Sequence, residues 1–206
     1  MPNDDHRIES LEALRLILGE PNPVTRQKVF AELDEQMRDF VARAPFCLLA
    51  TADADGQLEV SPKGDGPGFV LVEDARTLVL PDRKGNKLIF GLQNILANPR
   101  VALIFLLPGS DETLRISGRA ELYADPTLLA RLSARGQPAL LAIRIHVERC
   151  FFHCARAFLR ASLWNPATWP ERHKVSFGRQ LAPKLGGGDA LAAQIDAAID
   201  KGTADL

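Results

Sequence analysis

Two short stretches of the sequence place positively charged side chains beside glycines. The first reads Ser-Pro-Lys-Gly-Asp-Gly-Pro-Gly-Phe-Val over residues 61–70, and the second reads Leu-Pro-Asp-Arg-Lys-Gly-Asn-Lys over residues 80–87. Glycines let backbone N–H groups come close to a ligand, and a lysine or arginine at the same point supplies positive charge. This combination suits a phosphate group better than a neutral ligand. Each stretch alone is also compatible with an ordinary glycine-rich turn, but two of them flanking one hairpin favour the binding interpretation.

A third pattern, Glu-Thr-Leu-Arg-Ile-Ser-Gly-Arg-Ala at residues 112–120, gives a predicted strand one polar face. Side chains alternate between the two faces of a strand, so Thr113, Arg115 and Ser117 share one face and the apolar residues between them share the other. An arginine in the middle of a barrel strand costs free energy unless it is paired, lines a ligand site or lies in a subunit interface. A solvated outer face is the alternative interpretation.

Helical patterns and a series of short strands surround these stretches. Apolar side chains recur at helical spacing over residues 8–18 and 25–42, which predicts two N-terminal helices. Shorter helices are predicted over residues 86–98 and 125–135, and an alanine-rich helix over residues 189–201. The β-type runs, bounded by turn residues, cover residues 46–52, 57–62, 68–72, 77–81, 100–107, 112–123 and 139–151. The helix that follows the Arg-Lys pair of the second stretch is expected to favour an anion at its N-terminus.

The order of these elements indicates the fold class. Six or seven strands with few helices between them favour a closed or split antiparallel barrel over a sheet of β-α-β units, in which a helix would follow every strand. The predicted fold is therefore α+β, an antiparallel split β-barrel with flanking helices. The sequence has no internal repeat and no long linker, so residues 1–206 are predicted to form a single domain with N-terminal helices and a C-terminal helical tail.

The composition excludes several classes of partner. Of the 206 residues, 46% are hydrophobic and 25% are charged, which is enough apolar material for a sizeable core. The 25 basic and 26 acidic residues give a net charge of -1, so no global field attracts nucleic acid or an anionic membrane. No apolar run approaches the roughly 18 residues that a membrane span needs. A cytoplasmic protein without nucleic-acid or membrane partners is expected.

Three cysteines, Cys47, Cys150 and Cys154, are an odd number in a chain without an export signal, so reduced thiols are expected. Cys150 and Cys154 flank His153, but a structural zinc site takes four ligands from paired short spacings, which this segment does not provide. Buried thiols near a strand end are the simpler interpretation, and no metal site is predicted. No Ser-His-Asp order and no P-loop supports a hydrolase or a nucleoside triphosphatase.

Taken together, these stretches resemble the pyridoxamine 5'-phosphate oxidase-like FMN-binding family. The shared order is a strand that ends in a basic residue and glycines, a hairpin, an Asp-Arg-Lys-Gly turn, an Asn-Pro turn at 98–99, an apolar strand and a Gly-Arg-Ala strand end at 118–120. The resemblance covers residues 46 to about 123. It is greatest to a branch with the patterns S-P-R-G-D-x-P-G-F and L-P-D-R-x-G-N. Lys63 stands where that branch often has arginine, which keeps the charge but loses the bidentate fork.

The resemblance implies FMN bound at the interface of a homodimer. By this resemblance Lys63 and the Arg-Lys pair at 83–84 would hold the phosphate and ribityl side of FMN. Residues 61–64 and 80–82 would line the isoalloxazine ring, with further contacts from a neighbouring strand or subunit. The implied cofactor-binding residues are Ser61, Pro62, Lys63, Gly64, Leu80, Pro81, Asp82, Arg83, Lys84, Asn86, Thr113 and Arg115.

The function that the resemblance implies is an FMN-dependent oxidoreductase with a small-molecule substrate. The C-terminal residues that bind pyridoxal phosphate in the authentic oxidase have no counterpart in residues 162–206, so a different substrate is expected. Two alternatives stay open at this point. One is a non-catalytic binding protein that carries FMN or haem, and the other is an enzyme that uses a deazaflavin in place of FMN.

Overall fold

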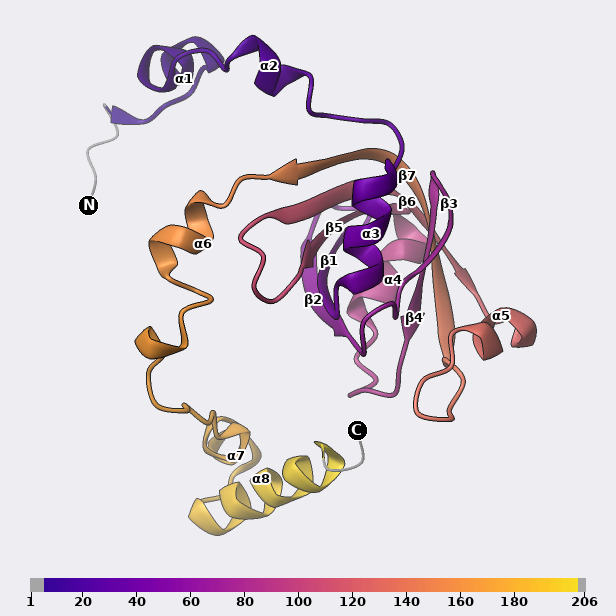
Figure 1. Ribbon diagram of the computed structural model, residues 1–206. Helices are drawn as coiled ribbons and strands as arrows, with labels where there is room; N and C mark the ends of the chain where they lie inside the picture. Colours follow the sequence, from indigo (N-terminus) through magenta and orange to yellow (C-terminus); the bar gives the residue numbers. More distant parts are fainter. Residues whose placement is uncertain (1–5, 204–206) are drawn as a thin grey trace. The chain divides into compact units, whose positions relative to one another are not determined.

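The main feature of the fold is a curved antiparallel sheet of seven strands (Figure 1). The computed structural model describes residues 6–203. The strands are β1 (Phe46–Ala52), β2 (Leu58–Gly64), β3 (Leu71–Asp74), β4 (Thr77–Asp82), β5 (Arg100–Leu106), β6 (Thr113–Tyr123) and β7 (Leu141–His153). Their order is β2-β1-β5-β6-β7-β4-β3, and within the described residues the sheet does not close on itself. The predicted α+β antiparallel split barrel with flanking helices is confirmed, and each predicted run overlaps one strand.

Helices precede, interrupt and follow the strands along the chain. They are α1 (Leu11–Leu18), α2 (Pro23–Arg26), α3 (Glu35–Arg43), α4 (Phe90–Ala97), α5 (Pro126–Arg131), α6 (Arg156–Ala161), α7 (Phe177–Leu181) and α8 (Asp189–Thr203), with short 3-10 helices η2 (Pro166–Thr168) and η3 (Pro183–Leu185). Between residues 6 and 203, no helix is long and apolar enough to cross a membrane. The chain divides into two compact units, Met1–Trp164 and Asn165–Leu206. The single domain over residues 1–206 stays a prediction.

The main core lies on the inner side of the curved sheet. Leu49 of β1 pairs in register with Leu103 of β5, which pairs with Ile116 of β6, and all three side chains are buried. Helix α3 packs on the same core through Met37 and Val41. Full burial of an aliphatic side chain of this size stabilises the fold by roughly 1.5–3 kcal/mol. The pattern of alternating buried residues is therefore what fixes the register of the sheet.

The helix predicted over residues 25–42 is wrong in its middle, where the chain leaves α2 and runs extended to α3. Phe30 forms a two-way backbone bridge with Cys150 of β7: its N–H donates to the Cys150 carbonyl at 3.0 Å, and its carbonyl accepts the Cys150 N–H at 2.9 Å. Asp34 then caps α3, because its Oδ1 accepts the Met37 N–H at 2.8 Å. Pairing with a distant strand thus overrides the local helical spacing.

The helix predicted over residues 86–98 begins later, at Phe90 of α4. Lys87 and Ile89 have positive φ angles of 61° and 48°, so the chain between β4 and α4 is an irregular loop. A residue with positive φ cannot belong to a right-handed helix. The expectation that the Arg-Lys pair at 83–84 lies at a helix N-terminus is therefore wrong, because this loop separates the pair from α4.

Strand β2 carries its polar and apolar residues on unusual sides. It lies at one edge of the sheet, next to β1. Glu59, Ser61 and Lys63 face the same side as the buried residues of β1, whereas Leu58 and Val60 face outward and are 79% and 56% exposed. An antiparallel strand with one face on the core ordinarily turns its apolar residues inward. The inversion places polar side chains on the inner side of β2 and leaves apolar side chains exposed on its outer side.

The second unit has its own packing between α7 and α8. A Cβ atom on Gly178 of α7 would lie 1.9 Å from the carbonyl oxygen of Ala192 in α8, so this close approach requires glycine. Asp196 of α8 accepts the Gly178 N–H at 2.7 Å, at the start of α7. The predicted alanine-rich helix is confirmed as α8, and it pairs with a neighbour that the sequence analysis did not predict.

The three cysteines differ in their burial. Burial raises the pKa of Cys47 to about 12 and that of Cys150 to about 11. The Cys150 thiol donates to the carbonyl oxygen of Glu32 at 3.1 Å, so this residue helps to fasten the segment before α3 to β7. Cys154 is exposed. Among the described residues, no three His, Cys, Asp or Glu side chains gather as metal ligands.

We expect one thiol of the native protein, that of Cys154, to react with an aromatic disulfide reagent at about pH 8. The thiolate is the reactive species, and burial keeps the thiols of Cys47 and Cys150 protonated and inaccessible. In denaturant all three should react, as measured by the absorbance of the released thiolate. A Cys154→Ser variant with one rapidly reacting thiol in the native state would contradict this assignment.

Candidate functional site

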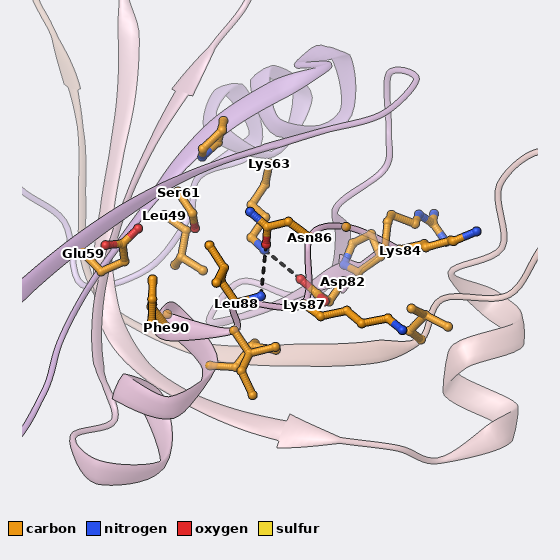
Figure 2. A pocket seen from close by; sticks show the side chains of 18 of the residues that line it. Leu49, Glu59, Ser61, Lys63, Asp82, Lys84, Asn86, Lys87, Leu88 and Phe90 are labelled. Atoms are coloured by element: carbon orange, nitrogen blue, oxygen red, sulfur yellow. Dashed lines mark hydrogen bonds and ion pairs between the residues drawn. The ribbon is translucent and has the colours of Figure 1, made fainter. Parts of the chain in front are cut away.

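A cavity of about 520 Å³ lies between the inner side of β2, the end of β4 and the loop that leads to α4 (Figure 2). Its volume is within the roughly 300–1,000 Å³ that is usual for small-molecule sites. Both glycine-rich stretches of the sequence line it, because each stretch begins in a strand that ends at this cavity. The fold thus brings together two segments that the sequence analysis selected separately.

Nine of the twelve cofactor residues predicted from the sequence line this cavity: Ser61, Pro62, Lys63, Gly64, Pro81, Asp82, Arg83, Lys84 and Asn86. The other three do not. Leu80 is fully buried in the core below the cavity lining. Thr113 and Arg115 lie on β6, which is separated from β2 by β1 and β5 in the sheet. Their predicted contact with the cofactor would therefore have to come from another subunit.

An ion pair joins the end of β2 to the end of β4. Lys63 Nζ donates to Asp82 Oδ1 at 2.7 Å, and the two side chains are 21% and 19% exposed. The strands β2 and β4 are not neighbours in the sheet, so this pair spans the open side of the barrel. Figure 2 shows the pair inside the cavity. Because the two charges neutralise each other, Lys63 adds little net positive charge to the site.

Asp65 forms a second link between the two stretches. Its side chain is only 4% exposed, and its Oδ2 accepts Arg83 Nε at 3.1 Å. Its Oδ1 accepts Arg135 Nη1 and the Gly66 N–H, both at 2.9 Å. Burial acts to raise the pKa of Asp65, but the Gly66 hydrogen bond and the charges of Arg135 and Arg83 outweigh it and hold this pKa below its ordinary value. The cluster of two arginines and one ionised carboxylate has a net charge of +1.

Arg83 has an unused donor beside the cavity. It lines the cavity, and its Nη1 is buried without a hydrogen-bond acceptor among residues 6–203. A buried donor that is left unsatisfied costs about 1–3 kcal/mol, and an acceptor oxygen on a ligand would remove that cost. Lys84 and Lys87 add exposed positive charges on the same loop. This part of the cavity is therefore suited to an anion.

The other end of the cavity carries apolar side chains, together with Glu59 and Ser61 of β2. Figure 2 shows Leu49, Leu88 and Phe90 at one end of the site, while Lys84 and Lys87 extend at the other. Leu49 belongs to the barrel core, and the other two apolar residues come from the β4–α4 loop and the start of α4. A ligand with a flat apolar part and an anionic part matches this division.

The third sequence pattern lies on the outer side of the sheet. Arg115 pairs in register with Ile104 of β5 and Phe151 of β7, so these side chains share a face. The Arg115 Nε is buried and has no acceptor within the described part of the chain. Burial lowers the pKa of His153, and the positive charges of Arg115 and Lys28 lower it further. This face therefore combines an unpaired arginine donor with positive charge.

Comparison with solved structures shows proteins of similar architecture. HupZ of Group A Streptococcus is 22% identical, with a TM-score of 0.47 and coverage of 58% of this chain and 93% of HupZ. An FMN-binding protein from Syntrophomonas wolfei is 11% identical, with a TM-score of 0.44 and coverage of 70% and 97%. A protein related to general stress protein 26, from Clostridium acetobutylicum, is 15% identical, with a TM-score of 0.45 and coverage of 59% and 90%. No curated protein matches the sequence.

The assignment to a family rests on a sequence match. The family model for pyridoxamine 5'-phosphate oxidase matches residues 33–154, which is more than half of the chain. The matched segment begins just before α3 and ends just after β7, so it contains the whole sheet and both stretches that line the cavity. The chain therefore belongs to the pyridoxamine 5'-phosphate oxidase family.

Proposed function

We propose that the cavity binds FMN and that the protein is an FMN-dependent oxidoreductase with a small-molecule substrate. The observation that carries this proposal is the buried Arg83 Nη1, a donor without an acceptor among the described residues, in a cavity that also holds Lys84. Charge-assisted hydrogen bonds between arginine and phosphate are among the strongest in proteins. Membership of the pyridoxamine 5'-phosphate oxidase family supports a flavin rather than an unrelated phosphate compound.

The two ends of the cavity suit the two ends of FMN. The phosphate fits the end with Arg83 and Lys84, where positive charge is in excess. The isoalloxazine ring is flat and largely apolar, and it fits the end with Leu49, Leu88 and Phe90. A cavity of about 520 Å³ has room for a molecule of this size. The residues present therefore fit the cofactor.

The protein's own contribution is to bind and orient. Bound FMN supplies hydride or electron transfer, which is the chemistry of the flavin itself. Arg83 and Lys84 hold the phosphate, and the Lys63–Asp82 pair keeps the ends of β2 and β4 at the distance that the cavity needs. We assign no catalytic residue in this chain.

We also propose that the protein is a homodimer with FMN at the subunit interface. The outward residues of β2 join an apolar face on β1 and β5, in which Leu58, Val60 and Phe46 are exposed. Strand β2 borders both this face and the cavity, and Val60 lies in the face and also lines the cavity, so a second subunit on the face would border the cavity as well. The same face extends to Arg115, whose buried Nε would gain an acceptor from a partner. A closed two-fold interface would bring Thr113 and Arg115 of the second subunit to the cavity.

The cellular location proposed is the cytoplasm. All three cysteines are free, and the exposed thiol of Cys154 is compatible with a compartment in which glutathione keeps thiols reduced. A fluorescent fusion located outside the cytoplasm would contradict this part of the proposal.

The test of the proposed function is to titrate FMN into the purified protein. We expect the protein to bind about one FMN per chain, seen as quenching of flavin fluorescence and a shift of the flavin absorption bands. Binding follows because both the phosphate and the ring find matching surfaces in one cavity. A chain without measurable FMN affinity would overturn the proposal, and an absorption band typical of haem or of a deazaflavin would identify the ligand that replaces it.

Turnover is tested separately. Steady-state consumption of NADH or NADPH by the FMN-loaded protein, with oxygen or a dye as acceptor, distinguishes an oxidoreductase from a carrier. A protein that binds FMN tightly but never accepts electrons from either donor would be a binding protein, and the oxidoreductase part of the proposal would fall.

A further inference from the structure

We propose that Asp65 is a positioning residue for phosphate recognition. It holds Arg83 by one edge of the guanidinium group, so that the opposite edge is presented to the phosphate of FMN. This inference rests on the proposed FMN site. It adds a residue that is not part of the cavity lining and that belongs to the same glycine-rich stretch as Lys63.

The geometry of arginine carries the inference. The guanidinium group is rigid and planar, and the N–H of Nε points away from the edge on which Nη1 lies. Asp65 Oδ2 accepts Arg83 Nε at 3.1 Å, whereas Arg83 Nη1 is buried and without an acceptor among the described residues. One edge of the guanidinium group is therefore fixed by Asp65, and Nη1 on the other edge is still available to donate a hydrogen bond.

Asp65 itself is firmly held. Its carboxylate is 4% exposed and accepts Arg135 Nη1 and the Gly66 N–H as well as Arg83 Nε. Arg135 comes from the loop between α5 and β7, so the carboxylate connects three separate segments of the chain. A side chain with these contacts has lost most of its rotamer freedom before any ligand binds. Pre-ordering of this kind lowers the entropy lost when Arg83 binds a phosphate.

The Asp65 carboxylate could act on FMN binding through its charge or by positioning Arg83, and the two roles predict opposite changes in FMN affinity when the carboxylate is lost. Asp65 carries a negative charge close to the site of an anionic ligand, and like charges repel. If charge alone decided the outcome, removal of the negative charge would tighten FMN binding. If Asp65 acts by positioning Arg83, its removal releases the guanidinium and weakens FMN binding. The direction of the change therefore distinguishes the two roles.

The experiment is Asp65→Asn, which keeps the size of the side chain, removes its charge and leaves one acceptor oxygen where the carboxylate has two for its three donors. We expect the Kd for FMN to rise about tenfold and the Kd for riboflavin, which has no phosphate, to change less than about twofold. Asp39→Asn removes a carboxylate from an exposed ion pair on α3 and serves as the control without effect on either ligand. Unchanged or tighter FMN binding by Asp65→Asn would overturn the inference, and so would an equal loss of riboflavin binding.

A double-mutant cycle tests whether Asp65 acts through Arg83. In an Arg83→Ala background, Asp65→Asn should change the FMN affinity less than about twofold, because the group that it positions is gone. A further tenfold loss in that background would overturn the inference. If Asp65→Asn does not fold, Arg83→Lys is the second variant: it keeps the charge but has no second edge, so FMN should again weaken about tenfold, and wild-type affinity would overturn the inference.

Failure of the inference and failure of the proposed function give different results. If the wild-type protein binds no FMN, the proposed function falls. If the wild-type protein binds FMN and Arg83→Ala weakens it, but Asp65→Asn does not, the FMN site stands and only the positioning role of Asp65 is lost.

Discussion

Arg83→Ala is expected to weaken FMN binding by about tenfold to a hundredfold and to leave riboflavin binding nearly unchanged. A hydrogen bond to a charged group contributes roughly 1.5–3 kcal/mol, and the phosphate is the part of FMN that riboflavin lacks. The side chain of Arg83 is 23% exposed and already fixed at Nε by Asp65, so little further ordering opposes its bond to the phosphate. The measurement is a pair of titrations, one with each flavin, followed by fluorescence.

Lys84→Ala is the matched comparison for this experiment. Lys84 neighbours Arg83 on the same loop but is exposed, and between residues 6 and 203 it forms no hydrogen bond or ion pair. A flexible, solvated ammonium group is a weaker phosphate ligand than a held guanidinium. We therefore expect a smaller loss of FMN affinity than for Arg83→Ala. A larger loss from Lys84→Ala, or an equal loss of FMN and riboflavin from Arg83→Ala, would place the phosphate elsewhere, with Lys63 and Arg115 the next candidates.

Arg83→Ala should alter the stability of the cofactor-free protein only modestly. Its loss removes one of three donors to Asp65, and the carboxylate keeps Arg135 and the Gly66 N–H. A collapse in the unfolding temperature would instead show that the contact between Arg83 and Asp65 is mainly structural.

The strands could be predicted because their determinants are local. The first hairpin is an example: Asp53 Oδ1 accepts the N–H groups of Asp55 and Gln57 at 2.9 and 2.8 Å, so the turn is formed by residues that are adjacent in the sequence. Strand β1 alternates buried and partly buried residues, and β2 alternates apolar and polar ones, so both show the two-residue period of a strand in the sequence. The two helices that were placed wrongly depend on other information. Phe30 is held by a strand residue 120 positions away, and no local pattern reports that contact.

The site could be predicted in part for a similar reason. Lys63 and Arg83 stand out because each lies beside glycines at the end of a strand, and both positions line the cavity. The sequence analysis missed the role of Asp65, although the residue lies in the first stretch. Its contribution depends on Arg135, which is 70 positions away and has no motif of its own. Pairings of this kind follow from the curvature of the sheet, which brings the end of β2 to the end of β4.

Val60→Asp is expected to convert a dimer into a monomer. In the proposed homodimer the protein has a mass of about 45 kDa, which is twice the 22.6 kDa of one chain. Val60 is 56% exposed in the single chain and lies on the outward face of β2, near the centre of the apolar surface that we assign to the interface. A carboxylate buried there would have no partner, and an unpaired buried charge costs several kcal/mol. The dimer dissociation constant should therefore rise at least on the order of a hundredfold.

The control is Leu96→Asp, because Leu96 of α4 is also an exposed apolar residue, at 77%, and lies outside this face. Light scattering with size-exclusion chromatography should give the dimer mass for the wild-type protein and for Leu96→Asp, and the monomer mass for Val60→Asp. FMN binding by the monomer should be weaker than in the dimer, because β2 borders both the apolar face and the cavity and the contacts from Thr113 and Arg115 of the second subunit would be lost. A wild-type monomer that binds FMN tightly would refute the interface. A Val60→Asp protein that remains dimeric would move the interface away from β2, and the cavity would then be complete within one chain.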